Sequence, residues 1–269
     1  MEACLRRSLE MMDLLSLLEL SAVILSLAFL SYASWKDWKL REVDDRVWLV
    51  FAPLGGFLTL ARTVLTGNPS FLQWGLSLAI TVVLGLTLYF LGFWGGADAK
   101  ALTCLALTLP VYPSFLKPLL GFYLTVFPVT ILFNTFILSA STVVYVSLRN
   151  FAYKLGGGRL FEGFEGEPAS KKLLALLVAY KVGREKLPGN PGLSLAEEAT
   201  AEGGGRRWRF RVGIGEEEEN LEVEELPQEV WVTPQLPLLF FLTAGLTVAL
   251  IFGDLALALT ASLFNLFRV

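Results

Sequence analysis

The sequence predicts an all-α polytopic membrane protein with six transmembrane helices and a small α+β cytoplasmic insertion before the last helix. Hydrophobic residues make up 54% of the 269 residues and charged residues only 17%, whereas charged residues are about 25% of an ordinary soluble domain. The apolar residues gather in six runs, most of them close to the 20 or so residues that cross a bilayer. More than half of the charged residues lie in one stretch near the end of the chain.

The predicted spans are residues 14–34, 47–65, 71–93, a short one at 99–111, 119–148 and 236–264. A cleavable signal peptide is the alternative for the first run, because Arg6 and Arg7 precede it, but Asp13 and Glu19 interrupt the run and favour a true span. The tandem Met11-Met12 suggests a start about ten residues further on.

Lysine and arginine near the span ends set the expected orientation. The loop after the first span holds Lys36, Lys39, Arg41 and Arg46, and Lys100, Arg149 and Lys154 follow at the same end of later spans. Only Arg62 and Lys117 are expected in the opposite loops. We therefore expect the loops that hold the first group of lysine and arginine residues to face the cytoplasm, with both chain termini outside.

The polar stretch divides the chain into residues 1–149, a soluble insertion at 150–234, and a last helix at 235–269. Residues 169–181 have the pattern of an amphipathic helix, which either lies on the inner membrane surface or packs in the core of the insertion. Residues 206–212 alternate charged and apolar side chains, which predicts a half-buried strand that pairs with 220–224. A nucleic-acid-binding role for the same residues is disfavoured, because the basic residues of the chain are not concentrated in one region.

The chain has no histidine and two cysteines, Cys4 and Cys104, about a hundred residues apart. This composition argues against a histidine-ligated zinc, a Ser-His or Cys-His pair and a disulfide framework. We expect no metal, no cofactor and no nucleic-acid partner. Any hydrolytic chemistry then has to come from carboxylates or from a Ser-Lys pair.

Two charged breaks interrupt the apolar pattern, one at residues 31–43 and one at 93–102. They place Asp37 and Asp98 where a bilayer helix normally has no charge, and such residues are functional candidates. We expect the two carboxylates to meet at the cytoplasmic ends of separate helices. Two neighbouring carboxylates share a proton, so that one activates water while the other donates to a carbonyl, as in aspartic proteases.

The residues around Asp98 have expected roles in this interpretation. Gly95 and Gly96 let the chain turn and let a substrate backbone approach, and Asp98 lies in the first turn of the next helix. Lys100 either steadies the carboxylates or anchors the helix at the inner surface. Weaker candidates for support of the pair are Tyr32, Ser34 and Asn134, whereas Asp254 is expected to be a packed or outer-interface acid.

These motifs carry a family resemblance. Gly95-Gly96-Ala97-Asp98, together with Trp35-Lys36-Asp37-Trp38 after the first span, resembles the archaeal preflagellin and type IV prepilin peptidases. These belong, with presenilin and signal peptide peptidase, to the membrane aspartyl proteases that carry a Gly-x-Gly-Asp motif. Ala97 stands where the general motif has its second glycine. The resemblance implies that Asp37 and Asp98 are the catalytic pair.

The resemblance also implies a substrate and a location. The expected reaction removes the short, positively charged leader of archaellin or type IV pilin precursors at the cytoplasmic face of an archaeal plasma membrane. Precursor proteins and membrane lipid are the expected partners, and the oligomeric state is left open. Glu42, Asp44 and Asp45 either bind the basic leader or form a solvated loop that balances nearby lysine and arginine.

Three alternatives compete with this prediction. A presenilin-like protease would cut within the membrane segments of general substrates. A small proton or cation transporter would use the carboxylates as an ion path, although both acids lie at one face rather than at the midplane. A membrane-anchored scaffold would tolerate the loss of either aspartate.

Overall fold

The computed structural model describes residues 2–188, 190, 192–199, 206–208 and 226–267. The chain divides into two compact units, one made of Met1–Leu138 and Pro237–Val269 and the other of Ser139–Leu236. The boundaries predicted from the sequence, at 150 and 234, stay a prediction.

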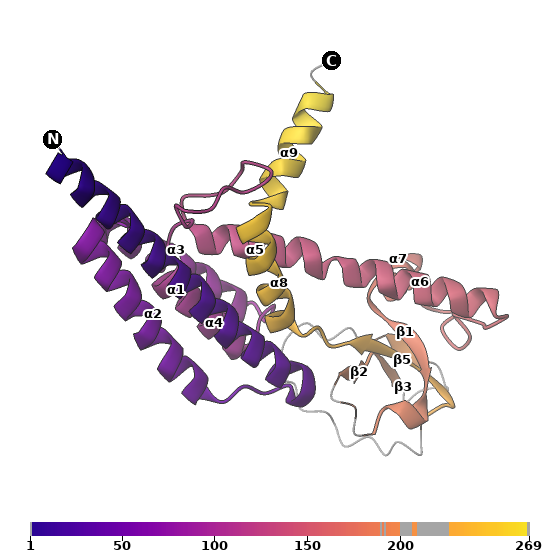
Figure 1. The fold of residues 1–269 in the computed structure, drawn as a ribbon. Helices are drawn as coiled ribbons and strands as arrows, with labels where there is room; N and C mark the ends of the chain where they lie inside the picture. Colours follow the sequence, from indigo (N-terminus) through magenta and orange to yellow (C-terminus); the bar gives the residue numbers. More distant parts are fainter. Residues whose placement is uncertain (1, 189, 191, 200–205, 209–225, 268–269) are drawn as a thin grey trace. The chain divides into compact units, whose positions relative to one another are not determined.

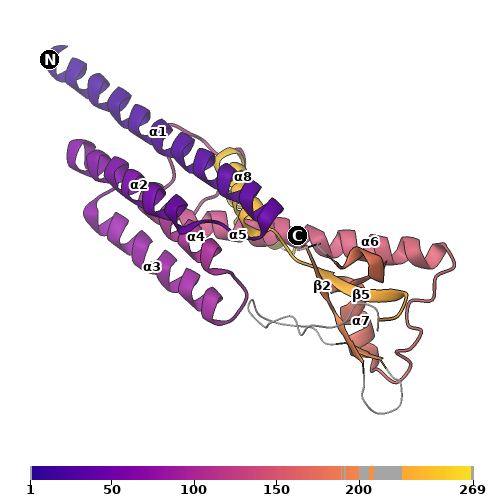
Figure 2. The ribbon, with the colours of Figure 1, turned by 90° about the horizontal axis from the view of Figure 1, so that it is seen from below.

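The first unit is helical (Figures 1 and 2). Its helices are α1 (Glu2–Leu40), α2 (Asp45–Thr66), α3 (Phe71–Phe90), α4 (Gly96–Thr108), α5 (Phe127–Ser139), α8 (Leu238–Ile251) and α9 (Leu255–Leu266), the last residue of α5 belonging to the other unit. Helix α4 contacts α1, α2, α3 and α8. The short helix therefore lies at the centre of the contacts within this unit.

Four described helices are long and apolar enough to cross a membrane: Met11–Leu40, Asp45–Thr66, Phe71–Phe90 and Phe127–Leu155, the last made of α5 and α6. The pair α8 and α9 makes a fifth if it counts as one span, bent by 59°. The predicted fourth span is the 13-residue α4, which is only about 20 Å long. Pro110 ends it, since a residue that precedes proline avoids the helical region. The protein is thus a multi-pass membrane protein, and the count of six spans stays a prediction.

Three predicted spans differ from the structure. The span expected at 119–148 begins only at Phe127, the first residue of α5. Helix α1 continues without interruption to Leu40, so the charged residues from 31 onward are helical, because no glycine or proline breaks the run. The predicted last span is interrupted at Gly253, whose φ of 91° favours glycine. A Cβ there would lie 2.2 Å from the Phe122 carbonyl oxygen, so the bend depends on the absence of a side chain.

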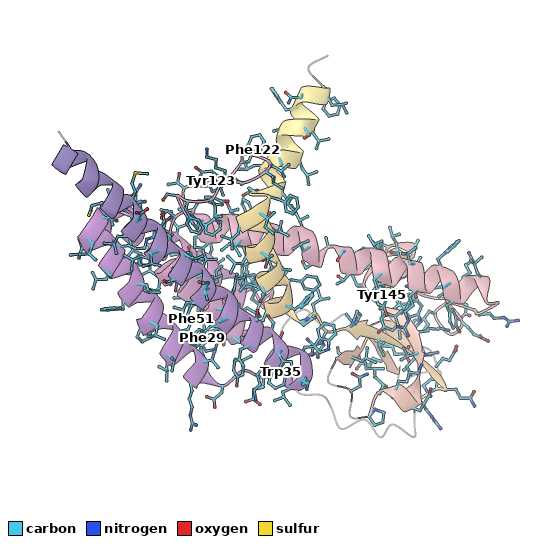
Figure 3. All side chains as sticks on the ribbon, viewed as in Figure 1. Phe29, Trp35, Phe51, Phe122, Tyr123 and Tyr145 are labelled. Atoms are coloured by element: carbon cyan, nitrogen blue, oxygen red, sulfur yellow. The ribbon has the colours of Figure 1, made fainter. Side chains whose placement is uncertain are left out.

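Close side-chain packing holds the first unit together. Phe29 of α1 stacks on Phe51 of α2 with ring centroids 4.9 Å apart (Figure 3). Gly245 lets α8 approach α5, since a Cβ there would lie 2.6 Å from Thr135 Oγ1. The connection at residues 109–126 packs on the end of α8, where the Leu119 N–H donates to the Ile251 carbonyl at 2.9 Å.

The second unit contains α6 (Ser141–Leu155), α7 (Ala169–Val178) and the short η1 (Arg184–Lys186). Its strands are β1 (Tyr180–Gly183), β2 (Leu193–Leu195), β3 (Glu197–Ala199), β4 (Arg206–Trp208) and β5 (Glu229–Pro234). They form an antiparallel sheet in the order β1-β5-β2, with Lys181 opposite Trp231, and a separate β3-β4 pair. This unit is the small α+β part that the sequence predicts.

The details of this unit differ from the prediction in two places. The expected helix 169–181 ends at Val178, because the backbone turns extended at Ala179 and continues as strand β1. The expected strand 206–212 begins as β4, which pairs with β3; its later residues and the expected partner 220–224 lie outside the described residues. A buried aromatic cluster that includes Phe164, Trp208 and Trp231 forms the core beside α7.

Candidate active site

Asp37 lies in the last turn of α1, where its side chain is half-buried. The helix ends three residues later at Leu40. The next residue, Arg41, has a left-handed backbone with φ 55° and donates its N–H to the Asp37 carbonyl at 3.0 Å. The Arg41 guanidinium attracts the Asp37 carboxylate, and the backbone N–H of Leu239, in the first turn of α8, donates to it. Two elements distant in sequence thus fix this carboxylate.

Asp98 lies in the first turn of α4 and is only 8% exposed. Its Oδ2 accepts the backbone N–H of Gly95 at 3.0 Å. The sequence correctly predicts this position, where the partial positive charge of a helix N-terminus favours a carboxylate. Asp98 is both a local cap of α4 and a buried acid at the centre of the unit.

The structure brings Asp37 and Asp98 within range of direct electrostatic repulsion. Asp37 lies near the end of α1 and Asp98 near the start of α4, and these two helices are in contact. Each carboxylate accepts an N–H from the start of a helix, α8 for Asp37 and α4 for Asp98. Two like charges close together hold on to one proton, so the arrangement suits chemistry in which one acid is ionised and the other is not.

Two family models match separate parts of the chain. Residues 24–146, which contain both aspartates, match the model described as the type IV leader peptidase family. Residues 171–255 match a second model, described as archaeal peptidase A24 C-terminus type II. Residues 24–146 are therefore similar to the type IV leader peptidase family.

Three curated relatives extend this similarity over most of the chain. The preflagellin peptidase of Methanococcus voltae is 26% identical over 228 residues, which are 82% of this chain and 90% of the relative. Those of Methanococcus maripaludis and Methanocaldococcus jannaschii are 24% and 23% identical over 80% and 85% of this chain, and over 87% and 92% of their own lengths. This protein is therefore a protease of the prepilin peptidase type.

The glycines of the motif do not make the turn into α4 in this peptidase. Gly95 has an ordinary extended backbone with φ −77°, and a Cβ on Gly96 would meet Tyr89 only at an ordinary contact distance of 3.8 Å. The left-handed residue of the turn is Gly92, with φ 75°. The turning role predicted for the motif glycines is therefore wrong, whereas the approach of a substrate backbone over Gly95, Gly96 and Ala97 stays a prediction.

Lys100 binds outside the carboxylate pair. Its Nζ lies 2.6 Å from Asp45 Oδ1, at the start of α2, and both side chains are largely exposed. Asp44 caps α2 by accepting the Arg46 N–H at 2.9 Å, whereas Glu42 is exposed. Two of the three acids predicted to bind a leader thus already have protein partners, and all three roles stay predictions.

The three weaker support candidates have different positions. Ser34 is buried one turn before Asp37 and bonds to α8, whereas Tyr32 is exposed. Asn134 holds the α8–α9 bend: its Nδ2 donates to the Gly253 carbonyl at 2.8 Å and its Oδ1 accepts the Leu255 N–H at 2.9 Å. Asp254, fully buried, caps α9 through the Leu257 N–H at 2.9 Å, in agreement with a packed acid.

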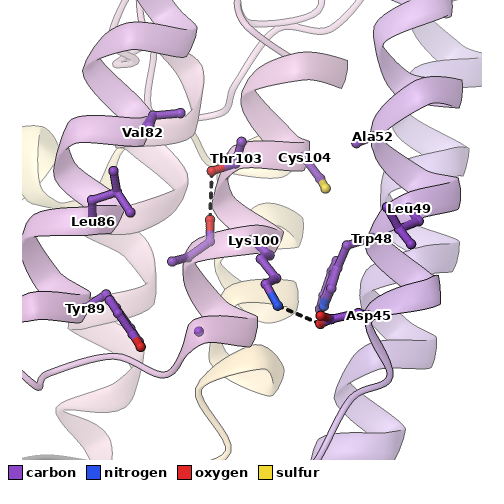
Figure 4. Close-up of a pocket in the computed structure, with 12 residues that line it drawn as sticks. Asp45, Trp48, Leu49, Ala52, Val82, Leu86, Tyr89, Lys100, Thr103 and Cys104 are labelled. Carbon is purple, nitrogen blue, oxygen red and sulfur yellow. Dashed lines mark hydrogen bonds and ion pairs between the residues drawn. The ribbon is translucent and has the colours of Figure 1, made fainter.

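A groove of about 600 Å³ lies on another side of α4, between α2 and α3 (Figure 4). Gly96, Lys100 and Thr103 of α4 line it together with apolar side chains of the two flanking helices, and neither Asp37 nor Asp98 is among its lining residues. The groove is therefore separate from the carboxylate pair.

Sequence reasoning missed the contribution of α8. Leu239 acts through its backbone, which no residue type reveals, and Thr243 is one of several threonines in apolar helices. Pro237, directly before α8, was a usable signal, because a proline there leaves the following N–H groups without a side-chain cap.

Among the described residues, no group of three or more His, Cys, Asp or Glu side chains could hold a metal ion.

Proposed function

We propose that this protein is an aspartyl endopeptidase that removes the short basic leader of archaellin or type IV pilin precursors at the cytoplasmic face of the membrane. The observation that carries the proposal is the approach of Asp37 and Asp98, two like-charged side chains from different helices, each supplied with a backbone N–H from a helix start. The named relatives are preflagellin peptidases, which directs the choice of substrate.

The proposed reaction uses the one proton that the two carboxylates share. The ionised carboxylate takes a proton from a water molecule, whose oxygen attacks the scissile carbonyl carbon while the protonated carboxyl donates to the carbonyl oxygen. The resulting tetrahedral diol collapses when a carboxyl group gives its proton to the leaving nitrogen and the C–N bond breaks. The second carboxylate takes back the hydroxyl proton, so the pair ends with one proton, as it began.

The substrate is proposed to lie with its basic leader near the loop between α1 and α2. Glu42 is exposed there, and Asp44 and Asp45 are bound only by exposed partners. Exposed ion pairs contribute about 0–1 kcal/mol, so a leader lysine or arginine could replace Lys100 at Asp45 at little cost. The scissile bond would then lie over the motif that begins α4.

The test is cleavage of a tagged archaellin precursor by wild type and by the Asp37→Asn and Asp98→Asn variants. Each variant should lose cleavage while its amount in the membrane stays normal. Asp254→Asn is the matched control, since it makes the same chemical change at a buried acid and asparagine caps a helix as well as aspartate. Cleavage that survives in either dyad variant would contradict the assignment.

Mapping the cut distinguishes the two protease alternatives. A new N-terminus directly before the hydrophobic segment of the precursor supports leader removal, whereas a cut inside that segment supports a presenilin-like activity. If wild type never cuts and proteoliposomes instead carry a proton flux that depends on both aspartates, the transporter alternative replaces the proposal.

The cytoplasmic orientation is also a proposal, supported by the lysine and arginine residues near Asp37 and Asp98. Glu42→Cys, in a chain whose own cysteines are replaced, should react with a membrane-impermeant maleimide only from the cytoplasmic side. Labelling from the outside of intact cells would reverse the proposed orientation.

A further inference from the structure

We propose that Ser34 and Thr243 are positioning residues of this peptidase, which fix the Asp37 carboxylate by locking the first turn of α8 against the end of α1. The inference rests on the proposed function and adds a third helix to its site. It starts from the contact between α1 and α8, where the backbone N–H of Leu239 donates to the Asp37 carboxylate.

The start of α8 has N–H groups to offer. The first four N–H groups of a helix have no partner within the helix, and a polar residue at the N-cap usually accepts one of them. In α8 the N-cap is Pro237, which makes no side-chain cap. Asp37, from the distant helix α1, takes the place of the missing cap.

The other side of the same residue is held by two hydroxyl groups. Ser34 Oγ donates to the Leu239 carbonyl at 2.8 Å and lies 2.6 Å from Thr243 Oγ1, which itself donates to the Leu239 carbonyl at 2.8 Å. Two hydroxyl protons are thus shared among three short oxygen–oxygen contacts: Ser34 to Leu239, Thr243 to Leu239, and Ser34 to Thr243. Ser34 is only 7% exposed, so water competes little with these bonds.

Together these bonds fix Leu239 from both ends of its backbone. The Leu239 carbonyl accepts from Ser34, which lies one helical turn before Asp37, and the Leu239 N–H donates to Asp37 itself. A neighbouring aromatic contact between Trp38 and Phe240, with ring centroids 5.8 Å apart, lies at the same crossing. If the hydroxyl groups are removed, the first turn of α8 can rotate, and the carboxylate loses its fixed orientation toward Asp98.

The test compares kcat and KM of purified Thr243→Val and Ser34→Ala with wild type on a leader-bearing precursor. Each should lower kcat roughly tenfold to 100-fold, since small errors of alignment slow catalysis by such factors, with KM and Tm unchanged. The double variant should resemble the single variants, because the two residues act through one network. Thr243→Ser keeps the hydroxyl and should restore kcat to nearly the wild-type value.

Thr247→Val is the matched control. Thr247 lies one turn further along α8, is exposed, and donates only to the Thr243 carbonyl at 2.9 Å, so its loss should leave kcat unchanged. The inference is overturned if the double variant keeps the wild-type kcat, or if kcat falls only in proportion to Tm and Thr243→Ser fails to restore it. Failure of wild type to cleave, or cleavage by Asp98→Asn, overturns the proposed function instead, and the inference with it.

Discussion

Two pairs of neighbouring ionisable side chains in the first unit differ in the sign of their charges. Glu19 of α1 and Arg62 of α2 are both fully buried, with Arg62 Nη2 3.1 Å from Glu19 Oε1. The other Glu19 oxygen accepts the Ser114 N–H at 2.8 Å and the Ser114 hydroxyl at 2.9 Å. Asp37 and Asp98, by contrast, repel each other, and Asp37 remains partly exposed.

The difference in charge indicates a structural role for the Glu19–Arg62 pair and a catalytic role for the Asp37–Asp98 pair. Opposite charges buried away from water tie α1, α2 and the connection after α4 together through the hydrogen bonds of Glu19, although Arg62 Nε and Nη1 are buried without a hydrogen-bond partner. Like charges destabilise a fold unless a proton neutralises one of them, so the repulsion between Asp37 and Asp98 offsets part of what each acid contributes at a helix start. The dyad is therefore the pair that we expect function to maintain, and the variants below test this contrast.

The largest expected effect is on catalysis by the dyad. Asp98→Asn should slow cleavage by about 1,000-fold or more, because it removes an acid–base group, while Tm in detergent stays the same or rises as the repulsion from Asp37 disappears. Precursor cleavage and thermal unfolding of the same preparation measure both quantities. A large fall in Tm would place Asp98 among the structural residues.

The reverse pattern is expected at the opposite-charge pair. Glu19→Gln leaves Arg62 as an uncompensated buried charge and should lower the free energy of unfolding by about 3–5 kcal/mol, with kcat of the folded enzyme unchanged. Chemical unfolding in detergent measures the change. The double variant Glu19→Leu with Arg62→Met should recover most of the loss, and a double variant no more stable than the single one would contradict the paired interpretation.

A smaller effect is expected from Ser114. Ser114→Ala removes the hydroxyl bond to Glu19 but keeps the backbone N–H bond, so it should lower the free energy of unfolding by about 1–2 kcal/mol, as for a hydrogen bond to a charged group. Unfolding measured beside Ser262→Ala, an exposed serine of α9 that donates to the Ala258 carbonyl of its own helix, provides the reference. Equal stability of Ser114→Ala and wild type would show that the N–H bond alone holds Glu19.

The smallest effect is expected at the exposed pair of Lys100 and Asp45. Lys100→Met should change the free energy of unfolding by no more than about 1 kcal/mol, because solvent screens exposed ion pairs. The difference should vanish in 1 M salt, where the Debye length is only about 3 Å. A larger change that persists in high salt would instead indicate that Lys100 interacts with the buried dyad.

Long apolar helices were the part of the fold that the sequence predicted well. The expected spans 47–65 and 71–93 correspond to α2 and α3, because uninterrupted apolar runs with clear flanks leave few alternatives. Arg62 was expected in an outer loop, but it lies inside α2, since a buried partner on α1 neutralises it. Such a pairing cannot be read from one helix alone.

The sequence by itself determined that this is a multi-pass membrane protein, that it has a small α+β region near the end of the chain, and that Asp37 and Asp98 are the acids to consider. These conclusions follow from local patterns of apolar and charged residues, which determine whether a segment is more stable in lipid or in water. Only the tertiary structure decided that α4 is a short helix enclosed by others, that Lys100 binds Asp45, that Asn134 serves the α8 bend, and that the start of α8 reaches Asp37. Those features depend on backbone groups and on partners more than 50 residues away, which no local pattern encodes.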